Sequence, residues 1–172
     1  GEPLGDEFQV NTWTGNEQNN ANVTGLENGG FFITWQDSSG SNNQIGGGES
    51  WDVRGQLYNA SGVAQGPEVL INTQTYNDQS APEVTALADG GYVVTWHSRY
   101  QDTGSSDYGI YGQRYDANGT PSGSEFRVNT YTSGEQTHPA VASMDDGGFV
   151  IAWQDSSGHD GGSGYDIRGQ RY

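Results

Sequence analysis

Short apolar stretches alternate with polar turns along the chain. The stretch at 149–153 reads Phe-Val-Ile-Ala-Trp and is apolar on both faces, which is typical of a strand that is covered on both sides. An Asp-Gly-Gly turn signal precedes it at 146–148, and an alternating, strand-like stretch follows at 165–172. No segment shows the period of about 3.6 residues that marks an amphipathic helix. The pattern predicts an all-β protein.

This pattern occurs three times. The hexapeptides at 7–12, 68–73 and 125–130 share the form Glu-x-x-x-Asn-Thr, and each Glu is followed by a Trp 28 residues later. The period is 57 residues and rises to 61 across an insertion of four residues within 36–50. Each repeat predicts four short strands. The predicted first strands are 21–26, 82–87 and 139–144.

Repeated units of four short strands are typical of a β-propeller. Small residues in the first strand suit the crowded axis, and the apolar second strand suits blades that stack face to face. We expect blades at 21–73, 82–130 and 139–172, with the strand 7–12 completing the last one. A β-solenoid, or a fragment of a longer array, is the alternative.

The order of the strands predicts a partner. The sequence opens on a fourth strand at 7–12 and finishes on a third strand at 165–172, an arrangement by which propellers hide their sheet edges. Three blades are fewer than the roughly four to eight that close a ring. We therefore expect a homodimer of three plus three blades, in which each strand 7–12 completes the partner's last sheet.

The charge excludes several partners. Lys and Arg number 6 against 22 Asp and Glu, so the net charge is −16. Such a surface repels nucleic-acid phosphates and anionic lipids. No apolar run approaches the roughly 18 residues of a membrane span, and the lack of Cys excludes disulfides and thiolate zinc sites.

Acidic loops between the second and third strands predict calcium. Asp residues spaced among Gly and Ser offer the hard oxygen ligands that calcium prefers, and calcium would offset the negative charge. The spacing does not match an EF-hand, and solvated turns are the alternative. The predicted ligands are Asp37, Asp102, Asp107, Asp155, Asp160 and Asp166.

Aromatic residues fall into two sets. Trp35, Trp96 and Trp153 recur in every repeat, which favours a place in the core between blades. Aromatic residues that do not recur are better candidates for stacking on sugars, with packing within loops as the alternative. This predicted glycan set is Trp13, Trp51, Tyr100 and Tyr108.

The repeat motifs resemble a known family. Glu-Phe-x-Val-Asn-Thr, Asp-Gly-Gly-Phe-Val-x-x-Trp and Tyr-Gly-Gln-Arg-Tyr-Asp-Ala-x-Gly are similar to repeats of large bacterial RTX-type proteins, which are exported by type I secretion and include surface adhesins. The resemblance covers 7–172 and implies a secreted or cell-surface protein in a calcium-rich setting. The RTX nonapeptide itself is not repeated. A weaker resemblance is to sialidase-type propellers, whose Ser-x-Asp-x-Gly-x-Thr-Trp turn is absent.

These patterns predict a non-enzymatic extracellular module for adhesion or for scaffolding by self-assembly, with calcium as its cofactor. The carboxylates Glu17, Asp78 and Glu135 recur in every repeat, which favours a structural role, so no catalytic residue is expected. The first alternative is a lectin-like propeller that binds a glycan or another cell-surface ligand. The second is a sialidase-like glycoside hydrolase.

Overall fold

The computed structural model describes residues 1–38, 50–102 and 107–172, and within these ranges it has eleven strands and no helix. The first sheet contains β1 (Gln18–Gly25), β2 (Phe31–Asp37), β3 (Asp52–Tyr58) and β4 (Val69–Leu70). The second contains β5 (Gln79–Ala86), β6 (Tyr92–Arg99), β7 (Tyr108–Tyr115) and β8 (Phe126–Arg127). The third contains β9 (Gln136–Ser143), β10 (Phe149–Asp155) and β11 (Asp166–Arg171).

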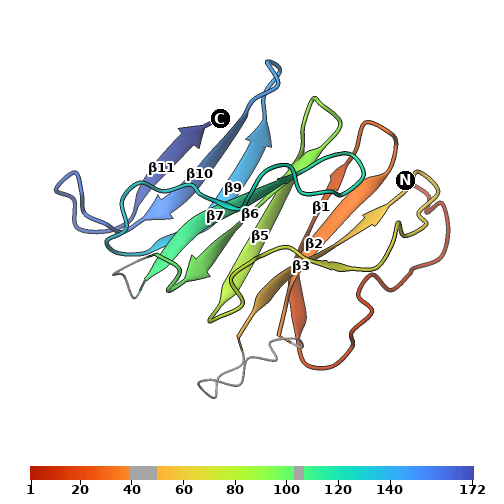
Figure 1. Ribbon diagram of the computed structural model, residues 1–172, viewed down its shortest axis with the longest axis horizontal. Coiled ribbons are helices and arrows are strands. Elements are labelled where there is room, and N and C mark those ends of the chain that lie inside the picture. The colour runs from red at the N-terminus through yellow and green to blue at the C-terminus, as the bar shows by residue number, and fades with distance from the viewer. Residues whose placement is uncertain (39–49, 103–106) are drawn as a thin grey trace.

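Each sheet is an antiparallel meander, and we call the sheets the first, second and third blade. They stand side by side in chain order, with the two ends of the chain at opposite ends of the row (Figure 1). The first strand of the second blade, β5, lies against the first blade, and β9 lies against the second. The predicted all-β fold of repeated blades is confirmed.

The hydrophobic cores lie between blades. One cluster joins Phe32 and Val53 of the first blade to Val94 and Trp96 of the second. The next cluster repeats this arrangement between the second and third blades, where Trp153 takes the place of Trp96. Trp96 and Trp153 are therefore core residues between blades, and Trp35 is buried as well.

A buried asparagine ends each complete fourth strand. Asn72 Oδ1 accepts a hydrogen bond from the Val53 N–H at 2.7 Å, and Asn129 Oδ1 accepts one from the Ile110 N–H at 2.8 Å. In each case a side chain takes over a bond to the third strand that the main chain of a longer fourth strand would have made. This explains why β4 and β8 are each 2 residues long, although the hexapeptide pattern predicts longer strands.

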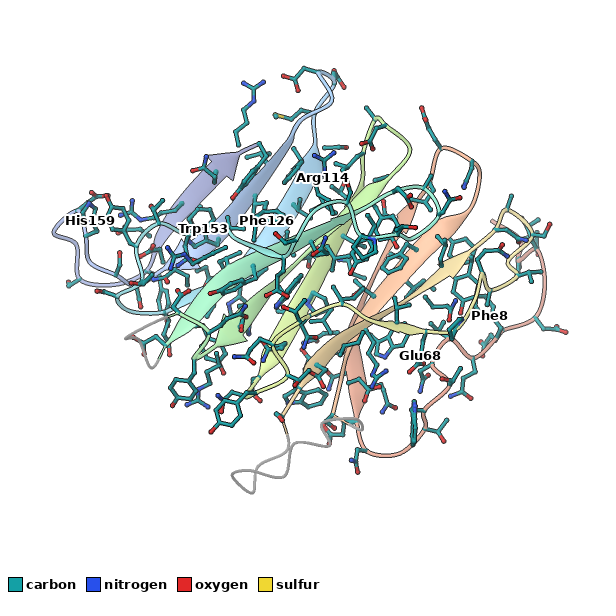
Figure 2. The ribbon with its side chains drawn as sticks, viewed as in Figure 1. Phe8, Glu68, Arg114, Phe126, Trp153 and His159 are labelled. Atoms are coloured by element: carbon teal, nitrogen blue, oxygen red, sulfur yellow. The ribbon has the colours of Figure 1, made fainter. Side chains whose placement is uncertain are left out.

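Residues 7–12, predicted as a strand, are not one in the structure. The Phe8 ring packs against Tyr58 with ring centroids 5.5 Å apart, and the Thr12 N–H donates to Glu68 Oε2 at 2.8 Å. Figure 2 shows Phe8 and Glu68 together at the first-blade end of the row. The strand that residues 7–12 are predicted to join, β11, lies at the other end of the row of blades.

Replacing Asn129 with Ala should lower the free energy of unfolding by about 2 to 3 kcal/mol, because the buried Ile110 N–H loses its acceptor. Asn118→Ala, in an exposed turn, is the matched control and should change stability by less than about 0.5 kcal/mol. Urea denaturation followed by Trp fluorescence measures both. Equal midpoints for the two variants would contradict this account.

Candidate functional site

The first strand of each blade carries the same irregularity. The strand register shifts between Asn19 and Asn22 in β1 and between Ser80 and Glu83 in β5, and β9 has the same kind of shift. At the equivalent positions Asn20, Ala81 and His138, φ is positive, at 51°, 51° and 53°. Non-glycine residues seldom adopt this backbone conformation, and such strain is concentrated at functional sites. The three bulges therefore draw attention to this edge of the sheets.

A cavity of about 600 Å³ opens beside these bulges, and we call it the inner-strand pocket. Residues from all three blades line it. Its amide residues are Asn20, Asn22 and Gln36; its carboxylates are Asp78 and Glu83; its ring-bearing residues are Trp51, His97, Tyr108 and His138; Ser80 lines it as well. This mixture of rings and convergent polar groups is typical of a binding site for a small polar molecule.

In the first and second blades, the side chain that follows the core tryptophan holds the bulge of the next blade. Gln36 follows Trp35, and its Oε1 accepts hydrogen bonds from Asn20 Nδ2 at 2.9 Å and from the Ala81 N–H at 3.1 Å. His97 occupies the equivalent position in the second blade, where its Nδ1 accepts the His138 N–H at 3.4 Å. Packing between blades thus fixes the pocket wall.

Glu83 is the half-buried carboxyl group of the pocket. Asn22 Nδ2 donates a hydrogen bond to its Oε2 at 2.7 Å. Burial raises the pKa of Glu83 above its ordinary value, and the hydrogen bond from Asn22 opposes that shift without cancelling it. Glu83 therefore keeps its proton to a higher pH than a solvated glutamate does.

Asp78 is the second carboxyl group of the pocket and has several partners. The Trp51 N–H donates to its Oδ1 at 3.4 Å, and Arg99 Nη1 lies 3.8 Å from its Oδ2. Burial raises the pKa of the Tyr108 hydroxyl, and the charge of Asp78 and a hydrogen bond to it raise that pKa further. Tyr108 is therefore neutral and donates its proton toward Asp78.

His97 is neutral at physiological pH. Burial and the neighbouring His138 lower the pKa of His97 to about 4. Because Nδ1 accepts a main-chain N–H, the ring proton is on Nε2, which lies 2.8 Å from Ser80 Oγ and donates to it. Nε2 therefore cannot take a proton from Ser80, and this pair is not an activated serine nucleophile.

The structure separates the four predicted glycan residues. Trp51 and Tyr108 line the inner-strand pocket. Trp13 is 60% exposed and Tyr100 is 41% exposed, and neither lines that pocket; the Arg99 guanidinium covers the Tyr100 ring at 4.8 Å. A glycan role for any of the four stays a prediction.

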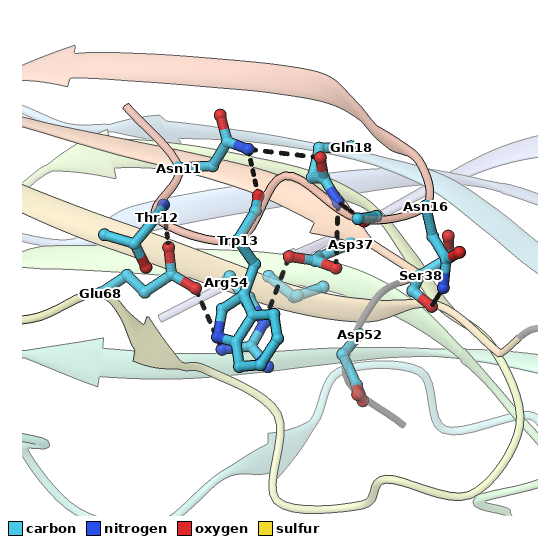
Figure 3. Close-up of polar contacts among 12 residues, drawn as sticks. Asn11, Thr12, Trp13, Asn16, Gln18, Asp37, Ser38, Asp52, Arg54 and Glu68 are labelled. Atoms are coloured by element: carbon cyan, nitrogen blue, oxygen red, sulfur yellow. Dashed lines mark hydrogen bonds and ion pairs between the residues drawn. The ribbon is translucent and has the colours of Figure 1, made fainter. Parts of the chain in front are cut away.

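Within the described residues, four of the six predicted calcium ligands form ion pairs with arginine side chains. Arg54 Nε lies 3.4 Å from Asp37 (Figure 3), and in the third blade Arg168 Nε lies 3.3 Å from Asp155. Asp102 pairs with Arg127 at 3.5 Å, and Asp160 with Arg168 at 2.7 Å.

Two further predicted ligands lie in or beside the strands. Asp107 precedes β7, and Asp166 begins β11 opposite Asp155. Among the residues that the structure describes, no group of three or more acidic or histidine side chains gathers to hold a metal ion. The insertion of the first repeat falls largely on 39–49, outside the described residues. Calcium stays a prediction.

Solved structures show similarity to the fold. An endo-arabinase from Bacteroides thetaiotaomicron is similar over 99% of this chain and 61% of its own, with 13% identity and a TM-score of 0.59. A thermostable family-43 glycoside hydrolase is similar over 92% of this chain and 55% of its own, with 16% identity and a TM-score of 0.54. The chain thus spans less than two thirds of either protein. These similarities identify the sheets as blades of a β-propeller.

Other comparisons add little. A mutant sialidase from Streptococcus pneumoniae has a TM-score of 0.46, which carries no argument. No protein-family model and no curated protein sequence matches the chain, so the RTX resemblance stays a prediction. Among the described residues no helix is long and apolar enough to cross a membrane, and secretion stays a prediction.

The prediction that the protein is not an enzyme is wrong. The two propeller structures that are similar to most of this chain are both enzymes. The recurrence of Glu17, Asp78 and Glu135 favours a structural role for those three residues, but it does not bear on a carboxylate that occurs in one repeat only. Glu83 does not recur, because the equivalent residues are Asn22 and Ala140. Aligning the first strands of the repeats would have shown Glu83 as a carboxylate unique to one blade.

His97 should make the protein less stable in acid. Its pKa is about 4 in the folded chain against 6.5 in the unfolded one, so the unfolded state binds more protons between these values, and stability falls as pH falls through them. His97→Gln copies Gln36 and cannot titrate. Urea titrations should show that the wild type loses on the order of 2 to 3 kcal/mol more than His97→Gln between about pH 6.5 and 4. Parallel losses in the two proteins would contradict the shift.

Proposed function

We propose that the inner-strand pocket binds a neutral glycan, and that the chain is part of a glycoside hydrolase in which Glu83 is the proton donor. One observation carries the proposal. A carboxyl group with a raised pKa, Glu83, shares a cavity with a second carboxyl group and with the aromatic rings of Trp51 and Tyr108. Support also comes from the fold, since similar propellers include an endo-arabinase and a family-43 glycoside hydrolase.

Glycoside hydrolysis commonly uses two carboxyl groups with different protonation states. A protonated Glu83 would give its proton to the leaving-group oxygen, and Asn22 would hold the resulting carboxylate through the bond to Oε2. Asp78, ion-paired with Arg99, would assist on the other side as the base or the nucleophile. The two carboxyl groups would thus divide the acid and base roles.

The pocket suits a neutral sugar. Aromatic rings bind the apolar face of a pyranose or furanose, and the side-chain amides of Asn20 and Asn22, which line the pocket, would bond its hydroxyl groups. An anionic sugar would meet two carboxyl groups and a chain of net charge −16. All six arginines already pair with carboxylates, so a free arginine cluster for a sialic acid carboxylate is not provided by the described residues. A neutral oligosaccharide therefore fits better than a sialoside.

We place this activity outside the cell. The support is the resemblance of the repeats to RTX-type secreted proteins. Calcium in the acidic loops would belong to the same setting.

Replacing Glu83 with Gln should lower turnover of a neutral glycoside about 100-fold to 10,000-fold, because the proton donor is lost while the shape of the side chain is kept. Arabinan and a panel of nitrophenyl glycosides would be used as substrates. Glu27→Gln, on the surface, is the control and should leave turnover unchanged. Unchanged turnover in Glu83→Gln, or no turnover of any substrate by the wild type, would overturn the catalytic role.

Replacing Trp51 with Ala should weaken oligosaccharide binding at least about tenfold, since a stacking ring is lost. Isothermal titration calorimetry with arabino-oligosaccharides and xylo-oligosaccharides measures the affinity. Trp13→Ala removes an exposed ring outside the pocket and should leave the affinity unchanged. The reverse pattern would move the glycan site to the N-terminal segment.

A further inference from the structure

The outer blades of the row expose positions that the repeats bury elsewhere. Val53 and Ile110, in the third strands of the first and second blades, are 0% exposed. The equivalent residue of the third blade, Ile167 in β11, is 75% exposed. Within the described residues β11 has a neighbour on one side, β10, whereas β3 and β7 each pair with a fourth strand as well. In the first two blades the outer edge of the third strand pairs with a fourth strand, and within the described residues the outer edge of β11 does not.

Residues 7–12 lie against the first blade where the fourth strand of a preceding blade would lie. The Thr12 N–H donates to Glu68 Oε2 at 2.8 Å, as the Thr73 N–H donates to Glu125 Oε2 at 2.7 Å. Thr73 follows the fourth strand of the first blade and Glu125 belongs to the second, so this contact joins one fourth strand to the next blade. The N-terminal segment makes the same contact to the first blade.

Aromatic contacts follow the same rule. Phe126 in β8 of the second blade packs against Tyr172 after β11, with ring centroids 5.2 Å apart. Phe8 packs against Tyr58 at 5.5 Å. The residues are equivalent in the repeat, so residues 7–12 stand where the fourth strand of a preceding blade would stand.

Asn11 shows what the segment lacks. Its Nδ2 donates to Gln18 Oε1 at 3.2 Å (Figure 3), as Asn129 Nδ2 donates to Gln136 Oε1 at 3.0 Å. Asn129 Oδ1 accepts a third-strand N–H, whereas Asn11 Oδ1 accepts the exposed Gln9 amide at 3.3 Å. The Asn11 side chain is thus held like that of Asn129, but its Oδ1 lacks the bond to a third-strand N–H that Asn72 and Asn129 make.

The edge of β11 has the matching features. Gly112 of β7 lies opposite Phe126, and a Cβ at Gly112 would lie 2.8 Å from Cζ of that ring. The equivalent Gly169 has open space there, because a Cβ would meet only the Ile151 carbonyl oxygen, at 3.5 Å. Gly169 thus leaves room for a ring that no described residue of its own chain supplies.

We propose that residues 7–12 of a second copy of this chain add to β11 as the fourth strand of the third blade. Applying the register of β8 on β7 places Phe8 opposite Gly169 and Gln9 opposite Arg168. It also directs Asn11 Oδ1 to the N–H of Ile167, as Asn129 Oδ1 meets that of Ile110. The occupant is a second copy because residues 7–12 carry the Glu-x-x-x-Asn-Thr sequence of the two fourth strands that fill this site within the chain.

The faces behind these strands are also matched. Val23, 61% exposed on the first blade, is equivalent to Val84, which is buried between the first and second blades. The equivalent of Ile167 in that core is Val53. A first blade docked on the third blade of another copy would therefore build a third core of the same kind. Two such contacts close a ring of two chains, whereas an unclosed contact would give a filament.

Light scattering after gel filtration, at rising protein concentration, tests the proposal. We expect a mass near twice 18.4 kDa. The dimer should tighten with added salt, because two chains of charge −16 repel each other less when screened. A mass of one chain at every concentration and salt level would overturn the strand addition. A mass that grows without limit would overturn the closed ring of two chains.

Variants on both sides identify the interface. Phe8→Ala and Asn11→Ala change the incoming strand, and Gly169→Val fills the space for the ring. Each should raise the dimer dissociation constant at least about tenfold while the far-ultraviolet circular dichroism stays unchanged. Val63→Ala, an exposed apolar residue in a turn, is the control and should leave association unchanged. A dimer that none of the three variants weakens would place the contact elsewhere and refute the strand addition.

Discussion

Apolar side chains from both partners hold each pair of neighbouring blades together in the described part of the chain. Trp96 and Val94 of the second blade need Phe32 and Val53 of the first, and the third blade needs the second in the same way. This dependence positions the inner-strand pocket, because Gln36 and its equivalent His97 directly follow the core tryptophans and hold the bulges of the next blade. The bulges that form the pocket wall are consequently held by packing between blades, which is the preorganisation that a binding site needs.

The same dependence makes the outer blades of the row different from the middle. A side chain such as Ile167 is core by its place in the repeat but exposed by its place in the chain. Its two equivalents are covered by a fourth strand and its asparagine. Residues 7–12 carry that strand sequence at the opposite end of the row (Figure 1). The proposed strand addition and the proposed pocket thus both follow from the repeated blade. They are independent proposals, so an experiment can refute one and leave the other standing.

Much of the fold could be predicted from the sequence, because the period fixes equivalent positions and alternation fixes the strands. The short fourth strands could not, since the Asn72 and Asn129 side chains replace main-chain bonds there. The bulges could not either, because Asn20, Ala81 and His138 share no residue type. Asp37 and Asp155 resembled calcium ligands because their arginine partners come from the next strand and only the fold brings them together. Trp51 and Tyr108 could be selected as aromatic residues outside the recurring tryptophans, although with Tyr165 they occupy equivalent positions of the three repeats. Glu83 required an alignment of the first strands.

The five tryptophans of the chain give a direct test of a glycan site in the inner-strand pocket. Each indole N–H gives one peak in a nitrogen–proton correlation spectrum, which would be recorded while a neutral oligosaccharide is titrated in. We expect the Trp51 peak to shift, because Trp51 lines the pocket, and the peak of the exposed Trp13 to stay in place. A spectrum in which the Trp13 peak moves and the Trp51 peak stays, or in which no peak moves with any glycan, would contradict a glycan site in this pocket.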